Sequence, residues 1–256
     1  MKERLVIRTA LVLLGLMLYP SQSCAQEYLP HLIARIQPAV VTVIIYDVSG
    51  KVIGNGSGFF IDPQGHLITN YHVLSRGARA EIKTQDGRRY PIKMVMAEDQ
   101  KADLIKVRVD LPADAPHSYL QVSATRPMVG ERVLVIGSPM GLDQTVTDGM
   151  VSGIRLLPGM GEMLQISAPI SPGSSGGPVV NVKGEVLGVA RGFLTRGQNL
   201  NFAIPGSRVL ALREGSPRPL VARDGKEHTP AMGLPPQPLG LPPRPTIHLP
   251  PRSPEP

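Results

Sequence analysis

The chain is dominated by short, apolar, β-branched segments separated by glycine-containing turns. Ala80–Thr84 and Tyr90–Met96, for example, flank the pair Asp86-Gly87, which is typical of a hairpin turn. Alternating strand–helix units, which would indicate a parallel sheet, are absent. The pattern therefore predicts a closed all-β architecture, which we divide into two barrels near residues 40–118 and 125–206. Short helices are expected at both ends of this region.

The first 25 residues have the features of a secretory signal peptide. A basic start precedes Leu11–Tyr19, an apolar stretch shorter than the roughly 20 residues that span a bilayer. Small residues at 23–25 fit a cut before Gln26. The alternatives are an uncleaved anchor and a lipid-modified Cys24. Because Cys24 is the only cysteine, a chain cut at this point contains no disulfide. We expect an exported protein, in a bacterial periplasm or secreted, without stable membrane insertion after cleavage.

Residues 26–214 form the predicted folded domain, and residues 215–256 form a Pro-rich tail. Thirteen of the 27 prolines follow Gly215, so the change in composition marks a boundary there. Proline lacks the amide donor that helices and sheet ladders need, which favours polyproline II or disorder. We therefore predict a disordered extension. A docking segment for a Pro-recognising module is the alternative.

The charge distribution argues against nucleic acid as a partner. The net charge is +7, but it is spread over the leader, body and tail, and no basic stripe is interleaved with aromatic residues. No Cys/His cluster has the spacing of metal ligands. We expect neither a metal nor another cofactor.

The densest chemical signal is the segment Gly173-Ser174-Ser175-Gly176-Gly177. A serine becomes a strong nucleophile only when a neighbouring base takes its proton. A tetrahedral intermediate also needs backbone N–H groups directed at its oxyanion. A Gly-x-Ser-Gly-Gly turn meets both needs, because Gly173 lets the chain curl and the following glycines leave room for substrate. By itself, such a segment is more often a simple Gly/Ser loop.

Two further segments supply a possible base and its orienting carboxylate. His72 follows a short strand in Thr69-Asn70-Tyr71-His72-Val73, and Asp103 stands at the head of the apolar strand Leu104–Val107. A carboxylate in this position can accept the Nδ1 proton of the imidazole and stabilise the imidazolium. The order His, Asp, Ser is that of chymotrypsin-like enzymes. Alone, each residue would more often be structural.

In the order and spacing of several short segments, the chain resembles the protease domain of the HtrA/Deg serine proteases. The matching segments are TNYHV, ADLIKV, SPGSSGGPVVN, KGEVLGV and NFAIP, over roughly residues 30–210. The resemblance implies two perpendicular, six-stranded antiparallel β-barrels of the chymotrypsin type. It also implies that His72, Asp103 and Ser175 form a catalytic triad, with the N–H groups of Gly173 and Ser175 as the oxyanion hole. Ser174 occupies the variable position before the nucleophile.

The sequence departs from its relatives in several places. Ser174 replaces the Asp that receives a new N-terminus in digestive zymogens, so activation by that route is not expected. Pro169, six residues before Ser175, replaces the acidic residue that binds Lys or Arg substrates, which predicts small or medium apolar P1 residues. The residues after Glu214 are too few and too Pro-rich for the PDZ domain common in the family. Trimerisation, also common there, would involve Tyr28.

Two main functional hypotheses follow. The first is a serine endopeptidase that cleaves exposed segments of exported, misfolded proteins through an acyl-enzyme. The second is a protease-fold chaperone or scaffold that binds unfolded polypeptide with little or no turnover. An esterase-like hydrolase would share the chemistry, but it conflicts with the all-β pattern and the order of the triad.

Overall fold

The computed structural model describes residues 28–112, 115, 117–138, 144–193 and 200–220. The predicted signal peptide, and the predicted tail beyond residue 220, lie outside these described residues.

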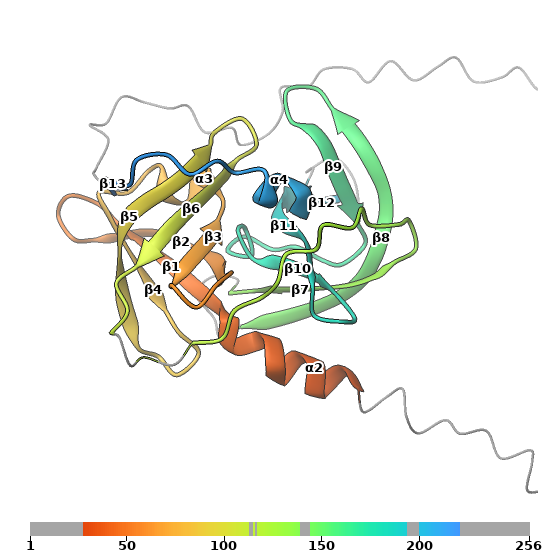
Figure 1. Ribbon diagram of the computed structural model, residues 1–256, viewed down its shortest axis with the longest axis horizontal. Coiled ribbons are helices and arrows are strands. Elements are labelled where there is room, and N and C mark those ends of the chain that lie inside the picture. Colours follow the sequence, from red (N-terminus) through yellow and green to blue (C-terminus); the bar gives the residue numbers. More distant parts are fainter. Residues whose placement is uncertain (1–27, 113–114, 116, 139–143, 194–199, 221–256) are drawn as a thin grey trace, which may run out of the picture. The chain divides into compact units, whose positions relative to one another are not determined.

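The first half of the described chain forms a six-stranded barrel. Its strands are β1 (Val40–Tyr46), β2 (Val52–Phe60), β3 (His66–Thr69), β4 (Arg79–Lys83), β5 (Arg89–Asp99) and β6 (Leu104–Val109). The order is β5-β4-β1-β2-β3-β6, and β6 pairs back with β5 to close the barrel (Figure 1). Every pairing is antiparallel, and closure removes the free edges that would otherwise invite aggregation.

The second half repeats this architecture with other strands. They are β7 (Arg132–Gly137), β8 (Thr145–Leu157), β9 (Gly161–Ile166), β10 (Pro178–Asn181), β11 (Val186–Phe193) and β12 (Asn201–Pro205). They form a closed barrel in the order β10-β11-β12-β9-β8-β7. The predicted all-β, chymotrypsin-like fold of two six-stranded antiparallel barrels is confirmed.

A shared apolar cluster joins the two barrels. Each barrel has its own interior, but this third cluster combines Phe59 and Ile68 of the first barrel with Leu134 and Ile136 of the second. All four side chains are fully buried. Burying a side chain of this size contributes about 1.5–3 kcal/mol, so the interface can hold the barrels together without a disulfide.

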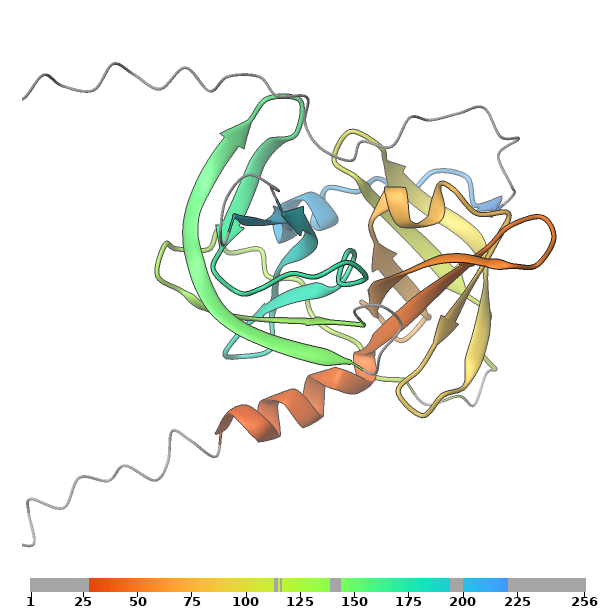
Figure 2. The ribbon, with the colours of Figure 1, turned by 180° about the vertical axis from the view of Figure 1, so that it is seen from behind.

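Helices are few among the described residues. They are α2 (Tyr28–Ile36), the 3₁₀ turn η1 (Gln37–Ala39), α3 (Tyr71–Leu74) and α4 (Gly206–Leu210). Helix α2 precedes β1 and leads into that strand where the two barrels meet (Figure 2). In the described part of the chain, none of these helices has the length and hydropathy needed to cross a bilayer.

After α4 the chain returns to the first barrel. The short strand β13 (Arg218–Pro219) pairs antiparallel with β5. On either side of it, the N–H of Gly215 donates to the carbonyl oxygen of Met96 at 3.2 Å, and that of Leu220 to Lys93 at 2.8 Å. Residues 215–220, which the composition assigned to the tail, are therefore bound to the first barrel.

Candidate active site

The carboxylate of Asp103 contacts both the backbone N–H and the imidazole of His72. Strand β3 ends at Thr69, Asn70 is extended, and α3 then carries His72. The His72 N–H donates to Oδ1 of Asp103 at 2.9 Å, and its Nδ1 lies 2.8 Å from Oδ2. With Nδ1 engaged, Nε2 is the ring nitrogen left to exchange a proton with a substrate or nucleophile.

The backbone around Asp103 has an unusual conformation. Its φ of 60° is the only positive φ of a non-glycine residue in the described chain. Aspartate tolerates this left-handed region better than most residues. Its carbonyl oxygen accepts bonds from the N–H of Tyr71 and from Nδ2 of Asn70, both at 3.1 Å. These bonds fix Asp103 directly beneath the segment that carries His72.

The carboxylate of Asp103 is buried yet ionised. Burial alone would raise the pKa of Asp103, but the hydrogen bond and charge of His72, together with the charge of Arg191, hold that pKa below its ordinary value. Arg191, on β11, donates from Nε to Oδ2 at 2.9 Å. The second barrel thus contributes a cation to a pair formed by the first.

A tight turn precedes Ser175. The N–H of Ser174 donates to the carbonyl oxygen of Ser171 at 2.9 Å, and Gly173 has a φ of 97°. Pro172 and Gly173 at the two central positions are typical of a type II turn. Within the described part of the chain, the N–H groups of Gly173 and Ser175 donate to no protein acceptor. Both donors are therefore available to an oxyanion.

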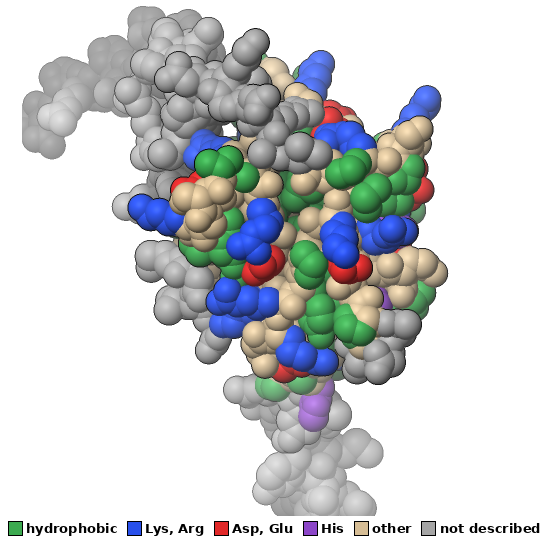
Figure 3. Space-filling view, turned by 90° about the vertical axis from the view of Figure 1, so that its left-hand side faces the viewer, with side chains coloured by type: hydrophobic (Ala, Val, Ile, Leu, Met, Phe, Trp, Pro, Cys, Tyr) green, Lys and Arg blue, Asp and Glu red, His purple; other side chains and the backbone are tan. Residues whose placement is uncertain are grey.

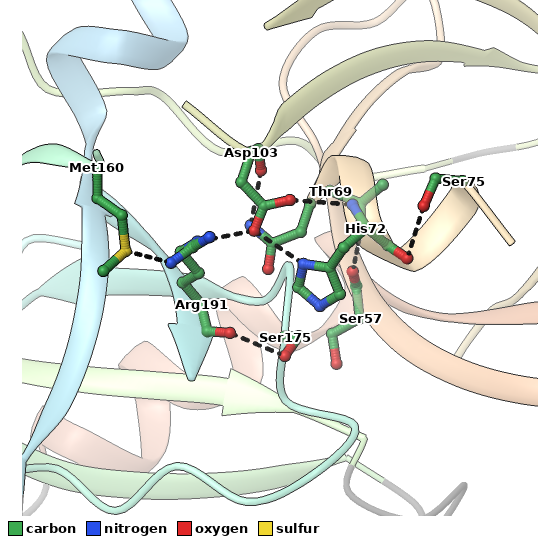
Figure 4. A network of polar contacts seen from close by, with 9 residues as sticks. Ser57, Thr69, His72, Ser75, Asp103, Met160, Ser175 and Arg191 are labelled. Atoms are coloured by element: carbon green, nitrogen blue, oxygen red, sulfur yellow. Dashed lines mark hydrogen bonds and ion pairs between the residues drawn. The ribbon is translucent and has the colours of Figure 1, made fainter. Parts of the chain in front are cut away.

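The Ser175 loop packs against the segment that leads to His72. A Cβ atom added to Gly176 would lie 2.2 Å from the carbonyl oxygen of Ser57, 2.3 Å from Oγ1 of Thr69 and 3.1 Å from N of Asn70. Only a glycine permits this approach. The structure thus brings the predicted residues His72, Asp103 and Ser175 together where the barrels meet (Figure 4).

The hydroxyl of Ser175 is directed at a neighbouring carbonyl. It donates to the carbonyl oxygen of Arg191 at 3.2 Å. In the view of Figure 4, the imidazole lies between the carboxylate of Asp103 and this hydroxyl. Ser174, by contrast, is 7% exposed, and its Cβ lies 3.0 Å from the position of a Cβ on Gly137. Of the two serines, Ser175 is the more accessible.

Pro169 lies on the segment after β9. Its ring is exposed between the buried residues Ala168 and Ile170, and its carbonyl oxygen accepts a bond from Oγ1 of Thr147 at 2.8 Å. The position carries no charge that could bind a cationic substrate side chain.

Charged groups on the first barrel are mixed in sign. Figure 3 shows a face on which Lys and Arg side chains are scattered among hydrophobic ones and lie beside Asp and Glu. In the first barrel, Lys93 forms an ion pair with Asp110, and Arg88 forms one with Asp86. Among the described residues, no group of three or more His, Cys, Asp or Glu side chains is arranged to hold a metal ion.

Comparisons with known proteins identify the family. Residues 56–189 match the trypsin-like peptidase domain. Serine protease HTRA1A of Danio rerio is 34% identical over 72% of this chain and 40% of its own length. A Pseudomonas savastanoi pv. phaseolicola protein, "Probable periplasmic serine endoprotease DegP-like", is 38% identical over 59% of this chain and 32% of its own.

A solved structure agrees with these sequence matches. The serine endoprotease from Yersinia pestis superposes with a TM-score of 0.63 and 29% identity, covering 72% of this chain and 64% of that one. The chain therefore belongs to the trypsin-like peptidase domain family, and its relatives in that family include HtrA/Deg serine proteases. It spans well under half the length of the curated relatives named above.

Two residues at the site were not foreseen from the sequence. Arg191 directly follows the apolar run Val186–Ala190 within β11, and a charge in such a strand signals a buried partner. Ser57 is fully buried, and its hydroxyl donates to the carbonyl oxygen of Gly173 at 2.7 Å. No local signal marked Ser57, because its partner is more than a hundred residues away.

Proposed function

We propose that this chain is a serine endopeptidase in which His72 is the general base, Asp103 orients it, and Ser175 is the nucleophile. The observation that carries the proposal is the carboxylate–imidazole contact of 2.8 Å at the barrel interface, beside a serine loop with two free N–H donors. Membership of the trypsin-like peptidase domain family and similarity to HtrA serine proteases support the same chemistry.

The proposed reaction begins with rotation of the Ser175 hydroxyl from the carbonyl of Arg191 toward Nε2 of His72. Such a rotamer change is fast on the scale of turnover. Oγ then bonds to the scissile carbonyl carbon while its proton passes to Nε2, and the carbonyl oxygen becomes an oxyanion at the N–H groups of Gly173 and Ser175. The C–N bond breaks as Nε2 returns the proton to the leaving amine. Water repeats the cycle on the acyl-enzyme.

The proposed substrates are polypeptides with exposed, unfolded segments, in exported and misfolded proteins. The name of the Pseudomonas relative describes that protein as periplasmic, which supports a periplasmic or secreted location here. With Pro169 in place of an acidic residue, P1 side chains are expected to be small or medium and apolar. Burying a cationic P1 residue without a counter-charge would be costly. A homotrimer is the proposed assembly, by analogy with the family.

A protease-fold chaperone or scaffold is the second candidate. One observation favours it: the Ser175 hydroxyl bonds to the carbonyl of Arg191 and not to His72. If this arrangement persisted, the nucleophile would remain unactivated and the site would bind polypeptide without cleaving it.

Labelling with a fluorophosphonate probe separates the two candidates. The purified chain is expected to react at Ser175, whereas Ser175→Ala does not, and Ser174→Ala still reacts. A casein or peptide-library digest then tests turnover and P1 preference. Absence of labelling together with retained binding of unfolded protein would support the scaffold. Strong preference for Lys or Arg at P1 would contradict the role given to Pro169.

A further inference from the structure

One oxygen of Asp103 is shared between His72 and Arg191. Nδ1 of His72 lies 2.8 Å from Oδ2, and Nε of Arg191 donates to the same atom at 2.9 Å. Figure 4 shows the guanidinium and the imidazole on either side of this oxygen. His72 and Asp103 belong to the first barrel and Arg191 to the second, so this ion pair crosses the interface.

Arg191 is held in place at its far end as well. Its Nη1 contacts Sδ of Met160, in the turn between β8 and β9. The side chain of Arg191 is only 30% exposed and that of Asp103 only 6%. Solvent therefore screens this charge pair less than an exposed one. A guanidinium remains charged throughout the pH range in which proteins are folded.

We propose that Arg191 is a positioning residue that sets the lower end of the pH range in which His72 acts as a base. The inference rests on the proposed function and deepens it. A fixed positive charge beside the shared oxygen disfavours the protonated imidazole by repulsion. It also neutralises part of the negative charge with which the carboxylate would stabilise that imidazolium. Without Arg191 the full charge of the carboxylate would act on the imidazole, so loss of Arg191 is expected to narrow, from the acid side, the pH range in which Ser175 can be activated.

Other charged groups lie farther along the surrounding elements. Tyr71 is the neighbour of His72 on α3, and with Glu98 and Arg218 it lines a small cavity beside that helix. Arg208, from α4, lies close to Gly161, next to Met160. Glu98 forms an ion pair with Arg218. The ion pairs found at the His72 site, within the described part of the chain, are those of Asp103 with His72 and with Arg191.

The first test is the pH dependence of kcat/KM. Arg191→Gln removes the charge, and its acid limb is expected to move to higher pH by about 0.5–1 unit. Arg191→Lys keeps the charge and is expected to stay nearer the wild-type profile. Arg155→Gln is the matched control, since Arg155 is exposed on β8 and bonds to the neutral Gln165 at 3.0 Å. If Arg191→Gln does not fold, Arg191→Thr replaces it, because threonine is neutral and suits a strand.

A second measurement does not depend on turnover. The ring of His72 is titrated by NMR in the Ser175→Ala background, with its signals assigned by their loss in His72→Asn. Removal of the Arg191 charge is expected to move the titration midpoint to higher pH. Removal of the Arg155 charge is expected to leave the midpoint unchanged. An unmoved midpoint in the Arg191 variant, or equal shifts in both, would overturn the inference. Absence of fluorophosphonate labelling in the wild type would instead overturn the proposed function.

Discussion

The N–H of Ser57 donates to the carbonyl oxygen of Ser175 at 2.8 Å, which ties a strand of the first barrel to the Ser175 loop of the second. The hydroxyl of Ser57 adds a bond to the carbonyl oxygen of Gly173 and accepts one from the N–H of Ser138 at 2.9 Å. The loop that carries the proposed oxyanion donors is therefore held in place by a fully buried residue of the first barrel.

Replacing Ser57 by Ala is expected to weaken both stability and activity. The carbonyl of Gly173 and the N–H of Ser138 would lose a buried partner, which costs about 1–3 kcal/mol in the free energy of unfolding. Labelling at Ser175 is expected to slow at least tenfold because the turn is no longer fixed. Urea unfolding and the rate of fluorophosphonate labelling measure the two effects. Ser152→Ala, which removes only a 3.5 Å contact, is the control and should change neither.

Gly176→Ala is expected to be among the most damaging single substitutions. Gly176 has a φ of 87°, and a methyl group there would overlap the carbonyl oxygen of Ser57 and Oγ1 of Thr69. Overpacking and the left-handed backbone together cost about 2–4 kcal/mol. Gly54→Ala is the control, because no atom lies within 4 Å of its Cβ position. Similar thermal midpoints for the two variants would contradict this account.

Asp103→Asn is expected to preserve the fold and remove most of the activity. Asparagine accepts the left-handed φ of 60° as aspartate does, so the backbone should not change. The amide cannot stabilise an imidazolium, and it favours the wrong tautomer of His72. The rate of acylation should fall about a thousandfold or more. Circular dichroism checks the fold. A variant with near wild-type kcat/KM would exclude Asp103 from the role proposed for it.

The stability contributed by Asp103 should depend on pH with a definite sign. Its pKa is lowered in the folded chain, so the folded state binds the proton of this carboxyl less readily than the unfolded state does. The contribution is complete above the unfolded pKa and is lost as pH falls through the folded one. The difference in unfolding free energy between wild type and Asp103→Asn should therefore grow as the pH rises through the acid range to about pH 5, where the carboxyl of the unfolded chain is ionised, and then level off. A difference that shrinks over this interval would contradict the assignment.

Truncation should show that residues 215–220 contribute to the stability of the first barrel. A chain that ends after Glu214 loses β13, the bond from Leu220 to Lys93 and the contact of Leu220 with the core of the first barrel. We expect it to be less stable by about 1–3 kcal/mol than a chain that ends after Leu220. Urea unfolding of the two forms decides this. Equal midpoints would mean that β13 does not stabilise the barrel.

Local patterns in the sequence were sufficient to predict much of the fold. The β-branched runs and hairpin turns predicted an all-β chain in two halves, because strand formation depends on neighbours that are close in sequence. Strand β13 was not predicted, because Arg218-Pro219 has no strand-like pattern and forms a strand only where it meets β5. The short helix α3 was also not predicted, since four residues are too few to show a helical period.

For the site, the order of the three motifs and their resemblance to HtrA/Deg proteases predicted His72, Asp103 and Ser175, although none of these residues was diagnostic alone. Only the tertiary structure revealed that Arg191 shares the carboxylate of Asp103 and that Ser57 supports the Ser175 loop. Both contacts cross from one barrel to the other and join residues 88 and 118 positions apart in the chain. Packing of the two closed barrels decides which side chains meet there, and no local pattern encodes that geometry.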